Sequence, residues 1–192
     1  MEAFFVSTGI VALGEMGDKT QLLALILAAR FRQPLPIIAG ILVATLANHA
    51  AAGAVGGAVA ALLGPDVLRW VIGLGFIAMA GWMLIPDEMD DDDANVGNVT
   101  RFGVLGTTIV AFFLAEMGDK TQIATVALAA RFPDLVAVVA GTTLGMMLAN
   151  VPAVFLGDKV AKAVPMKLVH GVSAFIFLVL GALTLLNVGK LF

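Results

Sequence analysis

Apolar residues run along the chain in six long stretches separated by short polar segments. The stretches cover about residues 3–29, 35–63, 67–85, 103–130, 134–157 and 165–189. Each is long enough for a helix that crosses a bilayer, which needs about 20 mostly apolar residues. Runs such as Leu22 to Ala29 are continuous and do not alternate as the strands of a membrane barrel would. The pattern therefore predicts an all-α integral membrane protein, a six-helix bundle.

Composition supports a chain embedded in lipid. Of the 192 residues, 60% are hydrophobic and 13% are charged, and the mean hydropathy is +1.03, which is far more apolar than a soluble domain. The first stretch is too long for a cleaved signal peptide and follows Glu2 instead of basic residues, so we expect it to be retained as a helix. The absence of cysteine excludes disulfides and thiolate ligands.

One seven-residue segment, Glu-Met-Gly-Asp-Lys-Thr-Gln, occurs at residues 15–21 and again at 116–122. The similarity continues without a gap from 28–31 to 129–132, which indicates an internal repeat. We therefore expect a first three-helix repeat at 1–86, an acidic connecting loop at 87–100 and a second three-helix repeat at 101–192. Because three is odd, the second repeat enters the membrane from the opposite side, which predicts two inverted repeats.

The distribution of Lys and Arg predicts the orientation of this topology. One side carries Arg30, Arg32, Arg101, Lys159, Lys162 and Lys167, and the other carries Arg69, Arg131 and Lys190. We expect the richer side to be cytoplasmic, with both termini outside, in a multi-pass protein of the cell inner membrane. The acidic loop is then cytoplasmic, either as a solvated connector or as a funnel that concentrates divalent cations.

Carboxylates inside the apolar stretches predict a functional site, because a charged side chain at the bilayer centre is costly. Residues three apart share a face of a helix, so Glu15 and Asp18 are expected to project together near the middle of the first stretch. Glu116 and Asp119 repeat the pair in the fourth stretch. Inverted repeats bring these two helices together near the bilayer midplane. The four carboxylates are therefore expected to converge.

Four buried negative charges require compensation. Lys19 and Lys120 supply two positive charges if they turn inward, and one divalent cation or two protons would supply the rest, which is the chemistry of an exchanger. The side chains around the site offer oxygen ligands, which suit hard cations such as Ca²⁺, Mn²⁺ and Mg²⁺. The candidate ligands are Glu15, Asp18, Thr20, Gln21, Asn48, Glu116, Asp119, Thr121, Gln122 and Asn150.

Other polar residues in the apolar stretches have a structural alternative. Asn48 and Asn150 occupy nearly equivalent positions in the two halves, where their amides either bind the ion or hydrogen-bond between helices. His49 has no repeat partner, which favours a satisfied buried or interfacial histidine. Pro152 is expected to kink its helix and free carbonyls near Asn150.

Small residues at four-residue spacing predict close helix packing. The pairs are Gly53 with Gly57 and Gly141 with Gly145. The packing lies either inside one six-helix bundle or at a dimer interface, so the sequence leaves monomer and homodimer undecided.

Two copies of Glu-x-Gly-Asp-Lys/Arg-Thr/Ser in a six-helix chain resemble a known cation/proton antiporter family. That family includes the bacterial manganese exporters of the MneA type and the Golgi calcium/manganese transporters of eukaryotes. The resemblance covers essentially the whole chain, and neither motif departs from the pattern. It implies transport of Mn²⁺ or Ca²⁺ against protons, with the family's acidic positions at Glu15, Asp18, Glu116 and Asp119.

We therefore expect a proton-coupled divalent cation exporter, for Mn²⁺ first and Ca²⁺ second, that works by alternating access around the carboxylates. It is expected to be no enzyme and to need no cofactor; its partners are membrane lipid and the transported metal, not nucleic acid. One alternative is a cation channel without proton coupling. Another is an intramembrane aspartyl protease with Asp18 and Asp119 as its dyad, although the chain has no tyrosine for a Tyr-Asp motif. A third is a set of structural ion pairs within each motif.

Overall fold

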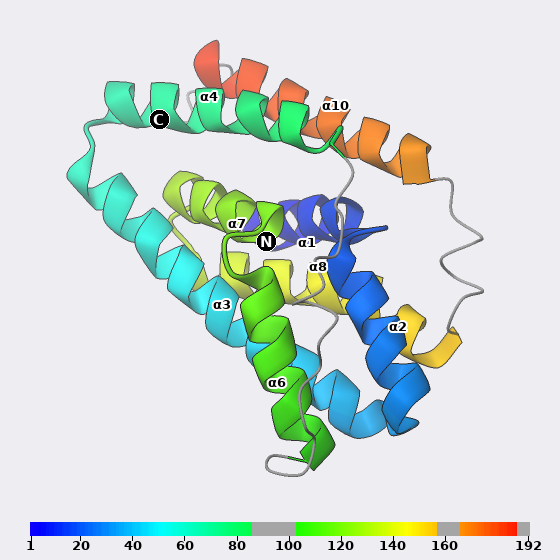
Figure 1. Cartoon of the computed structure of the whole chain (residues 1–192). Coiled ribbons are helices and arrows are strands. Elements are labelled where there is room, and N and C mark those ends of the chain that lie inside the picture. The colour runs from blue at the N-terminus through cyan, green and yellow to red at the C-terminus, as the bar shows by residue number, and fades with distance from the viewer. Residues whose placement is uncertain (86–102, 157–165, 188–192) are drawn as a thin grey trace.

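The computed structural model describes residues 1–85, 103–156 and 166–187. Within these residues the chain forms α-helices and no strand (Figure 1), so the predicted all-α fold is confirmed. The helices are α1 (Glu2–Glu15), α2 (Lys19–Phe31), α3 (Pro34–Leu62), α4 (Pro65–Trp82), α6 (Gly103–Glu116), α7 (Lys120–Arg131), α8 (Leu135–Leu156) and α10 (Met166–Leu185). The predicted acidic loop at 87–100 lies outside the described residues.

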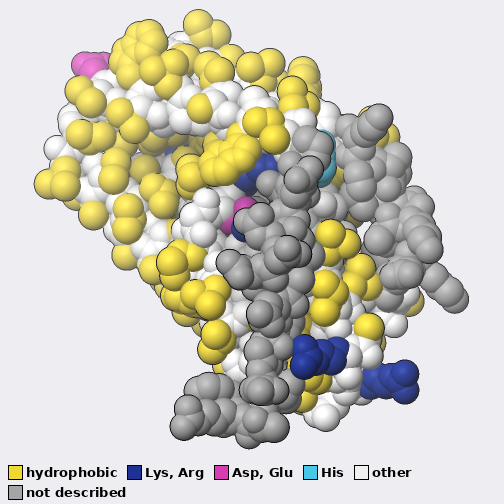
Figure 2. Space-filling view, viewed as in Figure 1, with side chains coloured by type: hydrophobic (Ala, Val, Ile, Leu, Met, Phe, Trp, Pro, Cys, Tyr) yellow, Lys and Arg dark blue, Asp and Glu magenta, His cyan; other side chains and the backbone are white. Residues whose placement is uncertain are grey.

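Long apolar helices and an apolar surface mark the chain as a membrane protein. Three described helices are long and apolar enough to cross a bilayer, namely α3, α8 and the part of α10 from Leu168 to Leu185, and α6 is a shorter apolar helix. Large side chains such as Leu35, Val136 and Phe175 are more than half exposed. Figure 2 shows hydrophobic side chains over most of the described surface on one face. A surface of this kind is suited to contact with lipid.

The first and fourth apolar stretches are broken helices, so the continuous helices expected from the hydrophobic pattern are wrong. α1 ends at Glu15 and α2 begins at Lys19, while α6 ends at Glu116 and α7 begins at Lys120. Both breaks fall on the Met-Gly-Asp of the repeated motif. The glycine in each has a positive φ, 84° in the first copy and 79° in the second, a conformation that glycine adopts without a Cβ clash. The aspartate then takes the N-cap position of the next helix.

Glycines fix how each broken stretch packs on a long helix of the other half. α6 packs against α3 at Gly40, where an added Cβ would lie 2.6 Å from the Cβ of Thr108. α1 packs against α8 at Gly141, where an added Cβ would lie 3.0 Å from the Cβ of Ser7. These two contacts are separated along the sequence by the same interval as the two motifs. The two halves therefore pack against each other through equivalent residues.

Three of the four glycines that the sequence selected for close packing do lie against neighbouring helices. Gly53 faces Leu135 at the start of α8, and Gly141 and Gly145 face the backbone of α1, whereas an added Cβ at Gly57 would meet nothing within 4 Å. Close packing inside the bundle is thus confirmed at three positions. The last layer is the pair α4 and α10, which lie side by side in Figure 1 and join the other helices through α7 and α1.

Candidate cation site between the two motifs

The two motifs fold into the same turn. Asp18 and Asp119 share nearly identical backbone angles, with φ of −77° and −76° and ψ of 166° in both. The N–H of each aspartate donates to the carbonyl of the motif glutamate, at 3.1 Å in both copies. Glu15 therefore ends one helix, and Asp18 stands at the N-cap position of the next. The expectation that they share one helical face was wrong, because Gly17 stops the helix between them.

This geometry brings the ends of half-helices to the site. α1 and α6 end at their glutamates, where the free carbonyls of a helix carry partial negative charge and favour a cation. α2 and α7 begin immediately after the aspartates. Discontinuous helices with ends of this kind line the ion sites of many secondary transporters.

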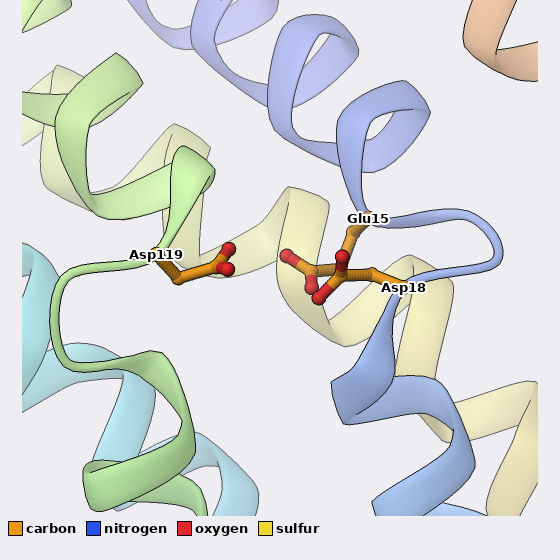
Figure 3. A group of neighbouring side chains, drawn as sticks. All are labelled: Glu15, Asp18 and Asp119. Atoms are coloured by element: carbon orange, nitrogen blue, oxygen red, sulfur yellow. The ribbon is translucent and has the colours of Figure 1, made fainter. Parts of the chain in front are cut away.

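Three carboxylates from the two motifs converge between these helix ends. One oxygen each from Glu15, Asp18 and Asp119 lies within 4.8 Å of the others. Figure 3 shows Glu15 and Asp18 approaching from one side and Asp119 from the other. All three side chains are buried. Two oxygens on opposite sides of a Ca²⁺ ion lie about 4.6 to 5.2 Å apart, and they lie closer around a smaller ion, so the spacing suits a single cation.

The fourth predicted carboxylate, Glu116, is fully buried but stands outside this close group. Its Oε2 accepts a hydrogen bond from Thr121 Oγ1 at 3.1 Å. Its Oε1 and the Oε2 of Glu15 have no hydrogen-bond partner among the described residues. A buried ionised carboxylate with an oxygen that accepts no hydrogen bond is unfavourable unless a cation or a proton compensates its charge. The structure therefore brings together three of the four predicted carboxylates. The fourth, Glu116, has one oxygen that accepts no hydrogen bond from the described residues.

The two threonines of the motifs orient the glutamates. Thr20 Oγ1 donates to Glu15 Oε1 at 2.6 Å, and Thr121 makes the matching bond to Glu116. The N–H of Thr121 also donates to Asp119 Oδ2 at 3.3 Å. A hydroxyl that donates still has acceptor lone pairs. Both threonines therefore hold the carboxylates across the helix break and keep an oxygen for an ion.

The two glutamines brace the turns. Gln21 Oε1 accepts the N–H of Gly17 at 3.1 Å, and Gln122 Oε1 accepts the N–H of Gly118 at 2.7 Å. Gln21 is buried, and its Nε2 also donates to the carbonyl of Ala149 in α8 at 3.0 Å. Gln122 is half-buried, and within the described ranges its amide nitrogen makes no comparable bond. In both copies the glutamine side-chain oxygen that was predicted to bind the ion accepts a hydrogen bond from the N–H of the motif glycine.

The two asparagines are buried but differ in their partners. Asn48 Nδ2 donates to the carbonyl of Phe113 in α6 at 3.1 Å, which is the helix-to-helix bond raised as the alternative from sequence. Asn150 Nδ2 donates within α8 to Met146 O at 3.1 Å and contacts Met146 Sδ at 2.9 Å. The Oδ1 of Asn150 has no partner among the described residues. The amide oxygen of Asn150 is therefore buried and accepts no hydrogen bond from the described residues.

The two lysines of the motifs also have different partners. Lys19 Nζ lies 3.7 Å from Asp119 Oδ1, so it pairs with the motif of the other half. Lys120 is 2% exposed, and its Nζ donates to the carbonyl of Ile85 at 2.9 Å, just beyond the end of α4. Lys19 thus brings one of the two inward positive charges that the four carboxylates were expected to require.

The surroundings of the site include one backbone partner that the sequence did not indicate and a buried histidine whose ring nitrogens have no hydrogen-bond partner among the described residues. Nothing in the sequence marked the carbonyl of Phe113 as an acceptor, because it belongs to an apolar residue. The carbonyl of Ala149 adjoins Asn150, where Pro152 was expected to free carbonyls. Pro152 lies inside α8, three residues beyond Ala149. His49 is fully buried, but neither ring nitrogen has a hydrogen-bond partner in the part of the chain that the structure describes. The buried location expected for His49 is therefore confirmed, whereas its expected hydrogen bonds are not seen there.

Apolar helices, two helix breaks and a buried group of three carboxylates are features of a multi-pass membrane protein and of a site with the spacing to hold a cation. The model of the divalent cation/proton antiporter GDT1 family matches the chain twice, at residues 3–91 and 104–190, with one motif in each match. The chain therefore belongs to this family of divalent cation transporters, and the resemblance drawn from its two motifs is confirmed.

Relatives match along most of the chain. A Vibrio cholerae protein named "Putative manganese exporter" is 49% identical over 185 residues, which cover 96% of this chain and 90% of that protein. A GDT1-like protein of Synechocystis is 26% identical over 196 residues, covering 92% of this chain and 93% of the relative. The GDT1-like protein 3 of rice is 27% identical over 201 residues, covering 92% and 71%. No solved structure matches the chain significantly.

Proposed function

We propose that this protein exports a divalent cation, Mn²⁺ first and Ca²⁺ second, in exchange for protons. The observation that carries the proposal is the buried convergence of Glu15, Asp18 and Asp119, with oxygens within 4.8 Å drawn from both motifs. Membership of a divalent cation/proton antiporter family supports the same exchange.

The exchange follows from competition for the same oxygens. A carboxylate must lose its proton before it binds a metal ion, so a group of carboxylates holds either the metal or protons. Metal binds from the cytosol to the deprotonated group. Protons entering from outside then neutralise the carboxylates and release the metal outward. Two protons balance the charge of one divalent ion, which keeps the buried site close to neutral in both states.

The choice of ion follows from the ligands. Carboxylate, hydroxyl and amide oxygens suit Mn²⁺, Ca²⁺ and Mg²⁺, and the chain has no cysteine to favour a softer metal. The oxygen ligands alone do not separate Mn²⁺ from Ca²⁺. The name of the Vibrio cholerae relative, a manganese exporter, supports Mn²⁺ as the first candidate.

Alternating access would use two inverted three-helix repeats, residues 1–86 and 101–192. In this arrangement α1 with α2, and α6 with α7, each form one broken span. The equivalent contacts of Gly40 with Thr108 and of Gly141 with Ser7 support such a pseudo-twofold relation, as does the double match to the family model. The count of Lys and Arg supports an inner-membrane protein with both termini outside.

Purified protein in liposomes tests the proposal. Mn²⁺, Ca²⁺, Mg²⁺ and Zn²⁺ would each be added outside, with a pH-sensitive dye trapped inside. We expect Mn²⁺ and Ca²⁺ to drive proton movement that Glu15→Gln and Asp119→Asn abolish. Asp66→Asn is the matched control, because Asp66 is 90% exposed and pairs only with Arg69 within the described helices. Full exchange in either site variant would refute the assignment, and metal current without proton movement would favour a channel.

A further inference from the structure

Four buried side chains outside the carboxylate group have polar atoms that the described residues do not satisfy. They are Ser7 in α1, Thr45 and His49 in α3, and Thr143 in α8, with exposed fractions between 0% and 6%. Neither ring nitrogen of His49 and none of the three hydroxyls has a hydrogen-bond partner in the part of the chain that the structure describes. Polar atoms left unsatisfied in a dry interior are unfavourable, so these side chains are suited to a ligand that forms hydrogen bonds.

The hydroxyls next to two of these residues are satisfied within their own helices. Thr8 donates to the carbonyl four residues earlier at 2.8 Å, and Thr142 donates to the carbonyl three residues earlier at 3.1 Å. Ser and Thr in helices often bond to the preceding turn in this way. Ser7 and Thr143 make no such bond among the described residues. Their hydroxyls therefore keep the capacity to bind a ligand.

Ser7 and Thr143 both lie at the contact between α1 and α8. An added Cβ at Gly141 would lie 3.0 Å from the Cβ of Ser7, and Thr143 stands two residues further along α8. Ser7 is eight residues before Glu15, which corresponds to about 12 Å along α1. These two hydroxyls therefore lie between the start of α1 and the level of the carboxylate group.

His49 and Thr45 lie at the contact between α3 and α8. An added Cβ at Gly53 would lie 3.1 Å from Cγ2 of Val139. Because α3 and α8 pack together and run in opposite directions (Figure 1), His49 in the turn before this contact is level with Thr143 in the turn after it. Thr45 is one further turn along α3. We call Ser7, Thr45, His49 and Thr143 the buried polar cluster.

The other half of the chain does not repeat this cluster. At the interval that separates the two motifs, the equivalent residues are Thr108, Met146, Asn150 and Leu42. The hydroxyl of Thr108 is bonded within its helix at 2.8 Å, and Leu42 is apolar and 43% exposed. Of the four equivalents, only Asn150 has a buried polar atom without a partner among the described residues. The difference lies in the residue types, so the cluster belongs to one side of the site.

We propose that the buried polar cluster binds water and lines the passage between the carboxylate group and the side of the membrane where α1 begins. Buried water typically forms about three hydrogen bonds to polar groups that are otherwise unsatisfied, and hydroxyls and an imidazole offer both donors and acceptors. A charged species inside a bilayer requires water or polar groups around it. This inference rests on the proposed exchange and adds one of the two passages that the exchange needs.

The passage leads toward the second motif. Asn48, next to His49, donates to the carbonyl of Phe113 at 3.1 Å, three residues before Glu116. Glu116 has a buried oxygen without a partner among the described residues. In this state the cluster is buried where α1 packs on α8, so the passage is closed and opens when these helices separate. With both termini outside, as proposed above, it is the outer passage.

The absence of native cysteine allows a direct test by labelling. Ser7→Cys and Thr143→Cys, made separately and reconstituted in liposomes without metal, would be exposed to a small, positively charged thiol reagent. We expect each to be labelled about tenfold faster than Ile37→Cys, which requires local unfolding. Ile37 is the matched control because it is fully buried in an apolar cluster that includes α3. A rate at either cluster position no higher than that of the control would overturn the passage.

Thr143→Val and His49→Leu distinguish a passage from a metal ligand or a structural contact. We expect metal-for-proton exchange to slow about three- to tenfold, the effect of one hydrogen bond on a rate, while equilibrium Mn²⁺ binding and the unfolding temperature stay at the parent values. His49→Asn copies the equivalent residue of the other half and should keep most of the rate. Loss of Mn²⁺ binding, a lower unfolding temperature, or an unchanged exchange rate would each overturn the passage. Thr143→Val gives the same measurement if His49→Leu does not fold.

The passage and the proposed function fail in different measurements, because cysteine labelling requires no transport. Fast labelling of the cluster positions in a protein that exchanges no metal for protons would contradict the proposed function. Normal exchange in a protein whose cluster positions are labelled no faster than the control would contradict the passage alone.

Discussion

The hydroxyl of Thr20 donates to Glu15 Oε1 at 2.6 Å across the break between α1 and α2. Thr121 makes the equivalent bond to Glu116 at 3.1 Å. Each glutamate belongs to the end of one helix but is tied to the first turn of the next. Each glutamate is thereby oriented by the helices on both sides of a break.

Removing the Thr20 hydroxyl should weaken metal binding without unfolding the protein. Thr20→Val has almost the same shape but no donor, and losing an outer hydrogen bond to a metal ligand typically lowers affinity about 10- to 100-fold. The half-saturating Mn²⁺ concentration for proton movement in liposomes measures the effect. Thr20→Ser retains the hydroxyl and should stay near the parent value. Unchanged Mn²⁺ dependence in Thr20→Val would show that this bond does not orient Glu15.

Gly118→Ala should destabilise the protein through the backbone alone. The φ of Gly118 is 79°, and an added Cβ would meet nothing within 4 Å, so only the left-handed conformation opposes alanine, at about 1–2 kcal/mol. Thermal unfolding in detergent would report the loss. Gly9→Ala is the control, because Gly9 lies within α1 with open space around it, where alanine favours a helix by about 1 kcal/mol. Equal stability of both variants would contradict the strained turn.

Gly145→Ala should loosen the contact between α8 and α1. An added Cβ would lie 2.7 Å from the carbonyl oxygen of Thr8 and 2.8 Å from the amide nitrogen of Ala12, and overpacking of this kind costs about 1–3 kcal/mol. Gly57→Ala in α3 is the matched control, since nothing lies near that position. A lower unfolding temperature for Gly145→Ala but not for Gly57→Ala would support the packing. A drop of the same size in both would speak against it.

Metal binding should strengthen as pH rises. The carboxylates bind a cation only when deprotonated, so protons and metal compete and the apparent Mn²⁺ affinity falls at low pH. Titration of Mn²⁺ into detergent-solubilised protein at several pH values, in buffers of different ionisation enthalpy, measures both affinity and released protons. Binding that is independent of pH and releases no protons would exclude direct competition at these oxygens.

The sequence predicted which side chains form the site, but it did not predict the helix breaks that position them. Carboxylates such as Glu15 and Asp119 stand out because an apolar stretch makes them costly, and duplication of their motif links them. The helix break was missed, although glycine followed by an N-cap residue is a signal for a stop and a restart. The apolar residues on both sides of Gly17 form one stretch long enough to cross a bilayer, and this pattern favoured a single continuous helix.

Other features lie beyond what a single sequence contains. Lys19 and Lys120 stand in identical motifs, so no local pattern could assign them different partners. The acceptor of the Asn48 amide is the backbone of Phe113, which has no side-chain signature. The equivalent contacts of Gly40 and Gly141 required the packing of whole helices, because spacing alone predicted close approach without naming the neighbour.

Counting Mn²⁺ ions bound by the purified protein tests the central claim most directly. If carboxylates of both motifs share one ion, the parent protein binds one Mn²⁺ per chain, and Glu15→Gln and Asp119→Asn each abolish that single site. Two independent Mn²⁺ ions per chain, one lost with each variant, would contradict a shared site between the motifs, as would full Mn²⁺ binding in either variant.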